Sequence, residues 1–197
     1  MKLAEDGLRV ESCHDCDIST RRKSIVNGFG DTNKGTIVFI GEAPGHKEDV
    51  YGIPLIGRSG QLFNTYLTEV GLNRDVVYTT NVIKCRPARN RNPYDYEIEN
   101  CLVCLKSELR VIEPKVVILL GAVATQTYFQ NPRLRVSSIR NKPQWINERL
   151  IISIYHPAYI LRNKHDDDVL LDYFNAFVVI ARAYKYFIDP LFKLKYR

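Results

Sequence analysis

Four short apolar runs constrain the fold of this chain more than any other feature of its sequence. They are rich in β-branched residues, which favour extended backbone, and they lack the alternation of apolar and polar residues that marks a strand with one exposed face. Strands buried on both faces occur in parallel sheets that are covered by helices. The sequence therefore predicts four parallel strands, at residues 36–40, 76–80, 115–120 and 150–154.

The segments between these runs show helical periodicity. Alternating strands and helices predict an α/β protein with three layers, α/β/α, around a central four-stranded parallel sheet. The length of 197 residues is about that of one domain, and we expect a single domain over 1–197. We also expect a short helix at 2–12, a loop at 19–35 and a solvated basic tail at 187–197. The longer helices are predicted at about 59–70, 95–112, 121–130 and 166–188.

The chain is basic, with a net charge of +6 and a pI near 9.0. A basic balance favours a polyanionic partner such as nucleic acid. No apolar run reaches the ~18 residues that a membrane span needs, and the N-terminus does not have the pattern of a signal peptide. We therefore expect an intracellular, cytoplasmic protein with no membrane partner.

Five cysteines include two C-x-x-C pairs, a spacing typical of metal sites. An odd number of cysteines without a secretion signal argues against a disulfide framework. One interpretation is a zinc ribbon that uses both pairs, Cys13 with Cys16 and Cys101 with Cys104. On the predicted helix, however, Cys101 lies at the edge of the apolar stripe, and Cys104 points a further ~60° away. This geometry favours a metal site without Cys104.

Three polar side chains follow three of the predicted strands. Glu42 comes after the first strand, Asn81 after the second and His156 after the fourth. Ligands of parallel α/β sheets bind beyond the carboxyl ends of the strands, so we expect these residues to form one site at that edge. Each also has a structural alternative, as a turn cap, a turn residue or a core histidine. No phosphate-binding loop or nucleophile-elbow motif accompanies them.

Five motifs then decide between these alternatives. The chain contains, in order, GEAPG, GIPLIGRSGQLF, TNVIKCRP, NRNP and HPAYILR, together with Cys13, Cys16, Cys85 and Cys101. Over about residues 10–165 it resembles the family 4 uracil-DNA glycosylases, the iron–sulfur type. The resemblance implies a uracil-DNA glycosylase-like fold and a DNA repair enzyme. Such an enzyme flips uracil out of DNA, hydrolyses its N-glycosidic bond, releases free uracil and leaves an abasic site.

The resemblance also implies roles for the three strand-end residues. Glu42 and His156 are the expected catalytic residues: Glu42 activates the attacking water and favours the sugar cation, and His156 donates a hydrogen bond to uracil O2. The amide of Asn81 matches N3–H and O4 of uracil and mismatches cytosine.

Further residues fall on family motifs around the expected uracil site. The backbone of Gly41 and Ala43 is expected to line the site, and Glu48 and Asn90 are expected near it. Leu55 is a departure, because the family usually carries an aromatic residue there. An aromatic ring would stack on the base, worth roughly 1–3 kcal/mol, whereas Leu55 offers only an apolar floor. We therefore expect weaker uracil binding than in aromatic-bearing relatives.

Contacts to DNA are expected from two segments. Ile160 lies where relatives present an apolar wedge that fills the gap left by a flipped nucleotide; its alternative is a core residue on a short helix. Arg162 follows it on the same motif. Arg86, Arg89 and Arg91 lie in the basic loop at 82–100 and are expected to contact phosphates.

The resemblance takes four of the five cysteines as ligands of a [4Fe–4S] cluster. Cys104 is then a spare buried thiol. Because hydrolysis needs no redox step, the expected role of the cluster is structural: it ties an N-terminal segment, about 1–35, and the 82–100 loop to the sheet. The ligands are Cys13, Cys16, Cys85 and Cys101.

Two other functions are compatible with parts of the pattern. A non-catalytic, metal-containing nucleic-acid-binding module would share the basic surface and the cysteines without needing Glu42, Asn81 and His156 together. A hydrolase of free nucleosides would depend little on salt. The expected partner of the glycosylase is uracil-containing DNA, single- or double-stranded, and the expected state is a monomer.

Overall fold

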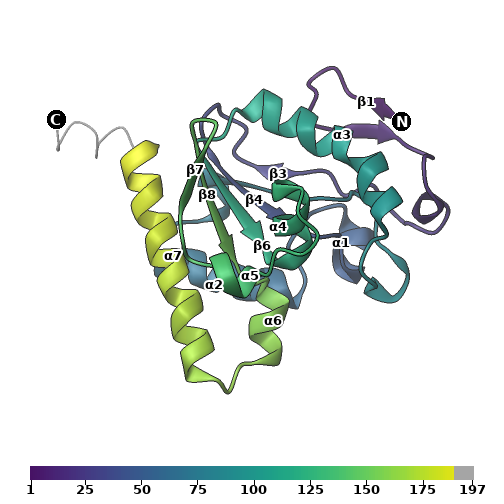
Figure 1. The fold of residues 1–197 in the computed structure, drawn as a ribbon. Coiled ribbons are helices and arrows are strands. Elements are labelled where there is room, and N and C mark those ends of the chain that lie inside the picture. The colour runs from purple at the N-terminus through teal and green to yellow at the C-terminus, as the bar shows by residue number, and fades with distance from the viewer. Residues whose placement is uncertain (189–197) are drawn as a thin grey trace.

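The computed structural model describes residues 1–188 and consists of a sheet between two layers of helices (Figure 1). Four central strands run parallel in the order β5-β4-β6-β8. Two antiparallel strands, β3 and β7, flank them at the edges. The bounds are β3 (Phe29–Gly30), β4 (Ile37–Gly41), β5 (Val77–Asn81), β6 (Val116–Leu120), β7 (Gln144–Ile146) and β8 (Arg149–Ile154).

The predicted α/β fold with four parallel strands is confirmed, and each predicted strand matches an observed one to within one residue at either end. The sequence does not predict the two edge strands. β3 has only two residues, too few for a pattern. β7 joins β8 through Asn147 and Glu148, whose φ angles are 48° and 62°. Two left-handed residues form a tight hairpin turn, and the Gly that usually signals such a turn is missing.

Four of the helices match the predicted ones and cover the sheet: α2 (Arg58–Glu69), α3 (Asp95–Ile112), α4 (Gly121–Phe129) and α7 (Asp167–Phe187). The sequence does not predict α1 (His46–Tyr51) or α5 (Val136–Ile139), because fewer than two turns show little periodicity. A last short helix, α6 (Pro157–Arg162), follows β8. Three 3-10 turns complete the described elements: η1 (Asp17–Thr20), η2 (Arg74–Val76) and η3 (Ala88–Asn90).

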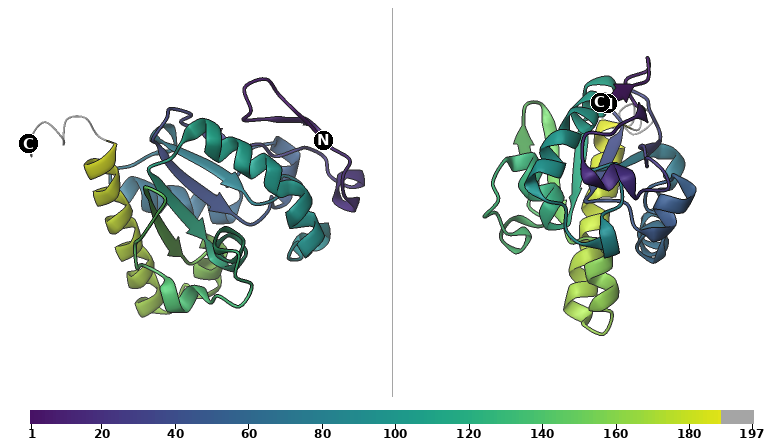
Figure 2. Two further views of the ribbon diagram at one scale, coloured as in Figure 1. Left: turned by 45° about the horizontal axis from the view of Figure 1, so that its top comes forward. Right: turned by 90° about the vertical axis from the view of Figure 1, so that its right-hand side faces the viewer.

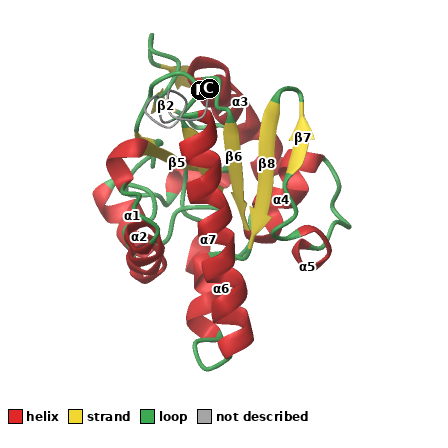
Figure 3. Ribbon diagram, turned by 90° about the vertical axis from the view of Figure 1, so that its left-hand side faces the viewer, coloured by secondary structure: helices red, strands yellow, loops and turns green. Residues whose placement is uncertain are grey.

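The two faces of the sheet have separate apolar cores. Helices α2, α6 and α7 cover one face, where Phe39 packs against Phe63 and Phe177. Helices α3 and α4 cover the other, with Leu105 and Ile112 against the strands. Figure 3 shows α7 crossing the near face of the sheet, with α3 and α4 beyond it. Neighbouring residues of one strand face opposite cores, which explains the unbroken apolar runs.

The predicted helix at 2–12 is wrong. The segment forms two antiparallel strands, β1 (Lys2–Leu3) and β2 (Val10–Ser12). The carboxylate of Asp6 accepts hydrogen bonds from the backbone N–H of Leu8 (2.9 Å) and Arg9 (3.3 Å), and Gly7 has a φ of 67°. A side chain that satisfies nearby backbone donors competes with a helix. In Figure 2 this N-terminal segment lies beside α3, where Asn100 donates to the Asp15 carbonyl at 2.8 Å.

Within residues 1–188, no helix combines the length and the apolar character that crossing a membrane requires. The predicted basic tail at 187–197 lies almost wholly outside the described residues.

Candidate active site

The polar residues that the sequence singles out lie at the carboxyl ends of three parallel strands, along one edge of the sheet. Asn81 is the last residue of β5, Glu42 directly follows β4, and His156 comes two residues after β8. The strand order β5-β4-β6-β8 sets these ends side by side along the carboxyl edge of the sheet, with Gly121 following β6 between Glu42 and His156. The edge therefore carries a carboxylate, an amide and an imidazole from segments far apart in the chain.

Two glycines make this close arrangement possible. A Cβ atom at Gly41 would collide with Oδ1 of Asn81, so the amide of Asn81 lies directly against the end of β4. A Cβ atom at Gly121 would lie 2.9 Å from Cβ of His156, and Gly121 has a φ of 86°. Both the space and the left-handed backbone at Gly121 require glycine.

Glu42 stands in a desolvated environment without a partner. Within residues 1–188, its carboxylate has neither a hydrogen bond nor an ion pair. Burial raises the pKa of the Glu42 carboxyl above its ordinary value of 4.5, because the charged form is poorly solvated. A carboxylate of this kind is a stronger base than an exposed one and remains free to bind a water molecule.

His156 is held in one neutral tautomer. The backbone N–H of Ala158 donates to His156 Nδ1 at 3.1 Å. Because a backbone N–H can only donate, Nδ1 carries no proton, and the neutral ring has its hydrogen on Nε2. Burial, assisted by the charge of Arg162, lowers the pKa of His156 to about 4. The ring is therefore neutral at ordinary pH and presents one N–H donor.

Comparisons with known proteins decide the family. The model of the uracil DNA glycosylase superfamily matches residues 28–178. A type-4 uracil-DNA glycosylase from Archaeoglobus fulgidus is 39% identical over 169 residues, covering 82% of this chain and 84% of that protein. The type-4 uracil-DNA glycosylase from Thermotoga maritima is 36% identical over 160 residues, covering 81% and 83%. The chain belongs to the type-4 uracil-DNA glycosylases. The family predicted from the sequence motifs is thereby confirmed. Another type-4 uracil-DNA glycosylase, from Sulfurisphaera tokodaii, is 37% identical over 189 residues, covering 91% of this chain and 86% of that protein.

In this glycosylase the loop that carries Leu55 is clamped on both sides. Glu48 Oε1 accepts from the backbone N–H of Ile56 (3.0 Å) and Gly57 (2.7 Å). Arg74 donates to the carbonyls of Pro54 (2.8 Å) and Leu55 (3.3 Å) from the other side. Leu55 has a φ of 54° and is 6% exposed.

The clamp gives Glu48 a positioning contact with the loop and adds Arg74, which the sequence does not single out. Arg74 also donates to Thr79 Oγ1 at 3.0 Å. Its two partners in the loop are backbone carbonyls about 20 positions away, and such partners leave no sequence pattern.

The structure separates the predicted DNA-contacting residues into three groups. Arg89 and Arg162 are exposed. Arg86 donates to the exposed Asn90 at 2.7 Å and contacts His46 at 3.1 Å, so it is partly engaged.

Two of the DNA-contact predictions do not fit this structure. Arg91 binds both carboxylate oxygens of Glu97, at 2.8 and 2.6 Å. Its guanidinium group is therefore already in a bidentate ion pair and is not available for a bidentate contact with phosphate. Ile160 is 1% exposed within the core between the sheet and α7. The wedge prediction for Ile160 is therefore wrong in this conformation, because its side chain would have to leave the core first; the alternative of a core residue on a short helix is the one observed.

All five cysteines line one small, mainly apolar cavity between the N-terminal segment and α3. The Arg22 guanidinium contacts Cys85 Sγ at 3.4 Å, and the backbone N–H of Lys84 donates to Cys101 Sγ at 3.3 Å. Cys104 is buried, as expected of a spare thiol, and donates to Met1 Sδ at 3.0 Å. However, it does not turn away from the cavity that the other cysteines line.

The cavity suits thiolate ligands of a cluster in its chemistry. Cationic and N–H donors to sulfur stabilise thiolates. Burial nevertheless raises the pKa of the Cys85 thiol to about 11, so the negative charge of its thiolate form would need to be offset by a bound metal. Among residues 1–188, no three His, Cys, Asp or Glu residues converge on a point as ligands of one ion do. The thiolates of a [4Fe–4S] cluster bind different irons and do not converge in this way.

Proposed function

We propose that this chain excises uracil from DNA with Glu42, Asn81 and His156 as its working residues. The observation that carries the proposal is the placement of these three residues at the ends of β4, β5 and β8 along one edge of the sheet, with Gly41 and Gly121 leaving room for the amide and the imidazole. The type-4 relatives support uracil as the base that is removed. We also propose that the chain works as a single domain and a monomer, in the compartment that holds the DNA.

The proposed reaction is hydrolysis of the bond between deoxyribose and an extruded uracil. Extrusion costs a few kcal/mol. As the bond breaks, positive charge grows on the sugar and negative charge on uracil. Glu42, desolvated and unpaired, favours the cationic sugar and accepts a proton from the attacking water. His156, with its hydrogen on Nε2, donates to the uracil oxygen that becomes anionic.

Asn81 is proposed to read the base. Its carboxamide forms no hydrogen bond with any residue between 1 and 188, so one acceptor and one donor are free for N3–H and O4 of uracil. Cytosine reverses this pattern at both atoms. A buried mismatch of this kind discriminates strongly, because the polar groups are left unpaired.

Cys13, Cys16, Cys85 and Cys101 are proposed to hold a [4Fe–4S] cluster, supported by their shared cavity and by the iron–sulfur chemistry that four thiolates favour. Bound there, the cluster would cross-link the N-terminal segment, the loop after β5 and α3. The proposed hydrolysis uses no electron transfer. A brown protein that absorbs broadly at about 400 nm is the expected appearance.

The decisive experiment is an assay for free uracil released from a uracil-containing oligonucleotide. Release is expected, and it should weaken steeply with added salt because several phosphates are contacted. Binding without release would support a nucleic-acid-binding module instead. Release from free deoxyuridine with little salt dependence would support a nucleoside hydrolase.

A first variant tests the contact between β4 and β5. In Gly41→Ala, the new methyl group meets the end of the Asn81 side chain, which can move, so the protein should fold while the amide is displaced. A displacement of about 1 Å can reduce function about 10²-fold. We expect inhibition by free uracil to weaken at least tenfold with a nearly unchanged melting temperature. Wild-type inhibition in this variant would show that the amide of Asn81 does not contact the base.

A second variant tests the missing aromatic ring. Leu55→Phe should strengthen uracil binding by roughly 1–3 kcal/mol, because a ring can stack on the base. The measurement is inhibition by free uracil together with turnover. Leu171→Phe, at a side chain that is 59% exposed on α7, is the matched control. Unchanged inhibition and turnover in Leu55→Phe would contradict the proposed place of this residue under the base.

A further inference from the structure

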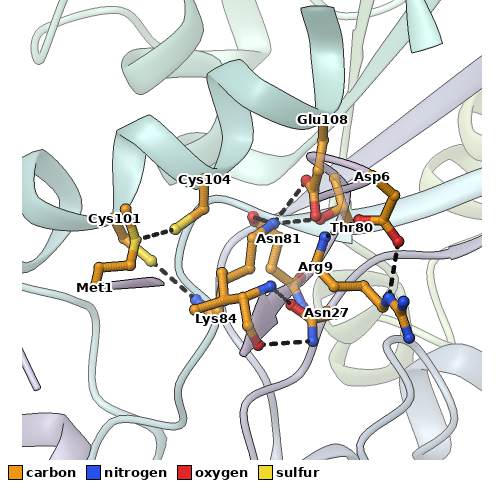
Figure 4. Close-up of polar contacts among 11 residues, drawn as sticks. Met1, Asp6, Arg9, Asn27, Thr80, Asn81, Lys84, Cys101, Cys104 and Glu108 are labelled. Carbon is orange, nitrogen blue, oxygen red and sulfur yellow. Dashed lines mark hydrogen bonds and ion pairs between the residues drawn. The ribbon is translucent and has the colours of Figure 1, made fainter. Parts of the chain in front are cut away.

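A buried lysine connects the cysteine cavity to the residue proposed to read the base. The Nζ atom of Lys84 donates to Glu108 Oε2 at 2.7 Å, to the Asn81 carbonyl at 3.0 Å and to Thr80 Oγ1 at 2.5 Å. Its own backbone N–H donates to Cys101 Sγ. Figure 4 shows Lys84 between Cys101 on one side and Asn81, Thr80 and Glu108 on the other.

Stability alone does not account for this ion pair. Lys84 and Glu108 are each 1% exposed, and removing two charges from water is so unfavourable that an apolar pair of similar size is often as stable. A buried ion pair that is not needed for stability can instead fix the geometry of the groups that it contacts.

The position of the pair identifies that role. Thr80 and Asn81 are the last two residues of β5, and Lys84 lies just beyond the strand end. Lys84 Nζ donates to the carbonyl of Asn81, and Thr80 Oγ1 donates to Glu108 Oε2 at 2.8 Å. The network therefore holds the backbone of Asn81, from which the carboxamide projects, and Glu108 anchors this network to α3.

We propose that Lys84, held by Glu108 and Thr80, is a positioning residue that sets the orientation of Asn81 for uracil. The proposal rests on the proposed function, in which Asn81 binds the base. Lys84 itself does not touch uracil. Its side chain acts through the Asn81 carbonyl, and its backbone N–H places the same segment against Cys101.

The test separates positioning from stability. Lys84→Met combined with Glu108→Leu removes both charges together, so no buried charge is left unpaired. We expect this double variant to keep a melting temperature near that of wild type and the same absorbance at about 400 nm from the proposed cluster. Its binding of free uracil should nevertheless weaken about 10- to 100-fold, the size expected when a group is misplaced by about 1 Å. Free uracil is neutral, so the loss of a positive charge does not by itself change its binding.

Three further variants complete the design. Glu108→Gln keeps an acceptor for Lys84 but leaves the lysine charge without a carboxylate, so its melting temperature should fall. Its uracil binding should stay within about threefold of wild type, because the donor to Asn81 remains. Lys106→Met, at an exposed site on α3, removes one positive charge without touching the network and should bind like wild type. If the apolar pair does not fold, Lys84→Gln with Glu108→Gln replaces it, since this pair also lacks both charges and the side chain at position 84 is one bond shorter than that of lysine.

The outcomes distinguish this inference from the proposed function. Asn81→Ala is measured in parallel and should lose uracil binding. If Asn81→Ala weakens binding and the folded double variant binds like wild type, Lys84 serves stability only and the inference is overturned. If Asn81→Ala itself binds like wild type, the assignment of Asn81 as the base reader fails, and the inference fails with it.

Discussion

Replacing Glu42 with glutamine is expected to lower the turnover of the glycosylase about 10²- to 10⁴-fold, the range typical of a lost general base. The amide has nearly the same shape but can neither accept a proton nor offset the positive charge of the sugar. Because the carboxylate of Glu42 has no hydrogen bond or ion pair within residues 1–188, its replacement leaves no other side chain unpaired. The melting temperature and the affinity for uracil-containing DNA should therefore stay close to those of wild type.

The same residue should set the acid limb of the pH profile. Turnover requires the charged carboxylate, so it should decrease as the pH falls through the pKa of Glu42, which burial raises above 4.5. His156, with a pKa of about 4, stays neutral over most of this limb. Glu69→Gln, at an exposed site on α2, is the control and should leave the profile unchanged. An acid limb that persists with the same midpoint in Glu42→Gln would assign it to another group.

The second large effect is expected from His156→Ala, which should lower turnover about 10²- to 10³-fold, as the loss of one donor to a developing anion usually does. The donor is Nε2–H, because the Ala158 N–H occupies Nδ1 at 3.1 Å. Single-turnover measurements with saturating enzyme report this step directly. Uracil inhibition should weaken as well, since the same donor faces the free base.

Two controls separate the role of His156 as a hydrogen-bond donor from its role in stabilising α6. The side chain also caps α6, so its loss alone should lower the free energy of unfolding by about 1 kcal/mol. His156→Asn supplies a good capping residue without a donor at the same distance, and it should recover stability but not turnover. His165→Ala, at an exposed position after α6, should change neither quantity. Near-wild-type turnover in His156→Asn with restored stability would mean that His156 acts only as a cap.

Periodicity and local chemistry in the sequence determined the central architecture. The four apolar runs specify strands buried on both faces, because every neighbouring side chain meets one of two cores. The long amphipathic helices follow for the same reason, and Glu42, Asn81 and His156 can be assigned to one edge because parallel strands end there together. The motifs GEAPG, TNVIKCRP and HPAYILR further identified the family, which the relatives confirm.

Only the tertiary structure decided which side chains are free to act. In the sequence, Ile160 and Arg91 resemble residues that contact DNA. In the structure, Ile160 is buried in the core and the guanidinium of Arg91 binds Glu97. Lys84 and Glu108 are 24 positions apart, and a buried ion pair between a loop and a helix has no sequence period. Local patterns record which face of an element is apolar; they do not record which distant group meets a given side chain, because that depends on how the elements pack.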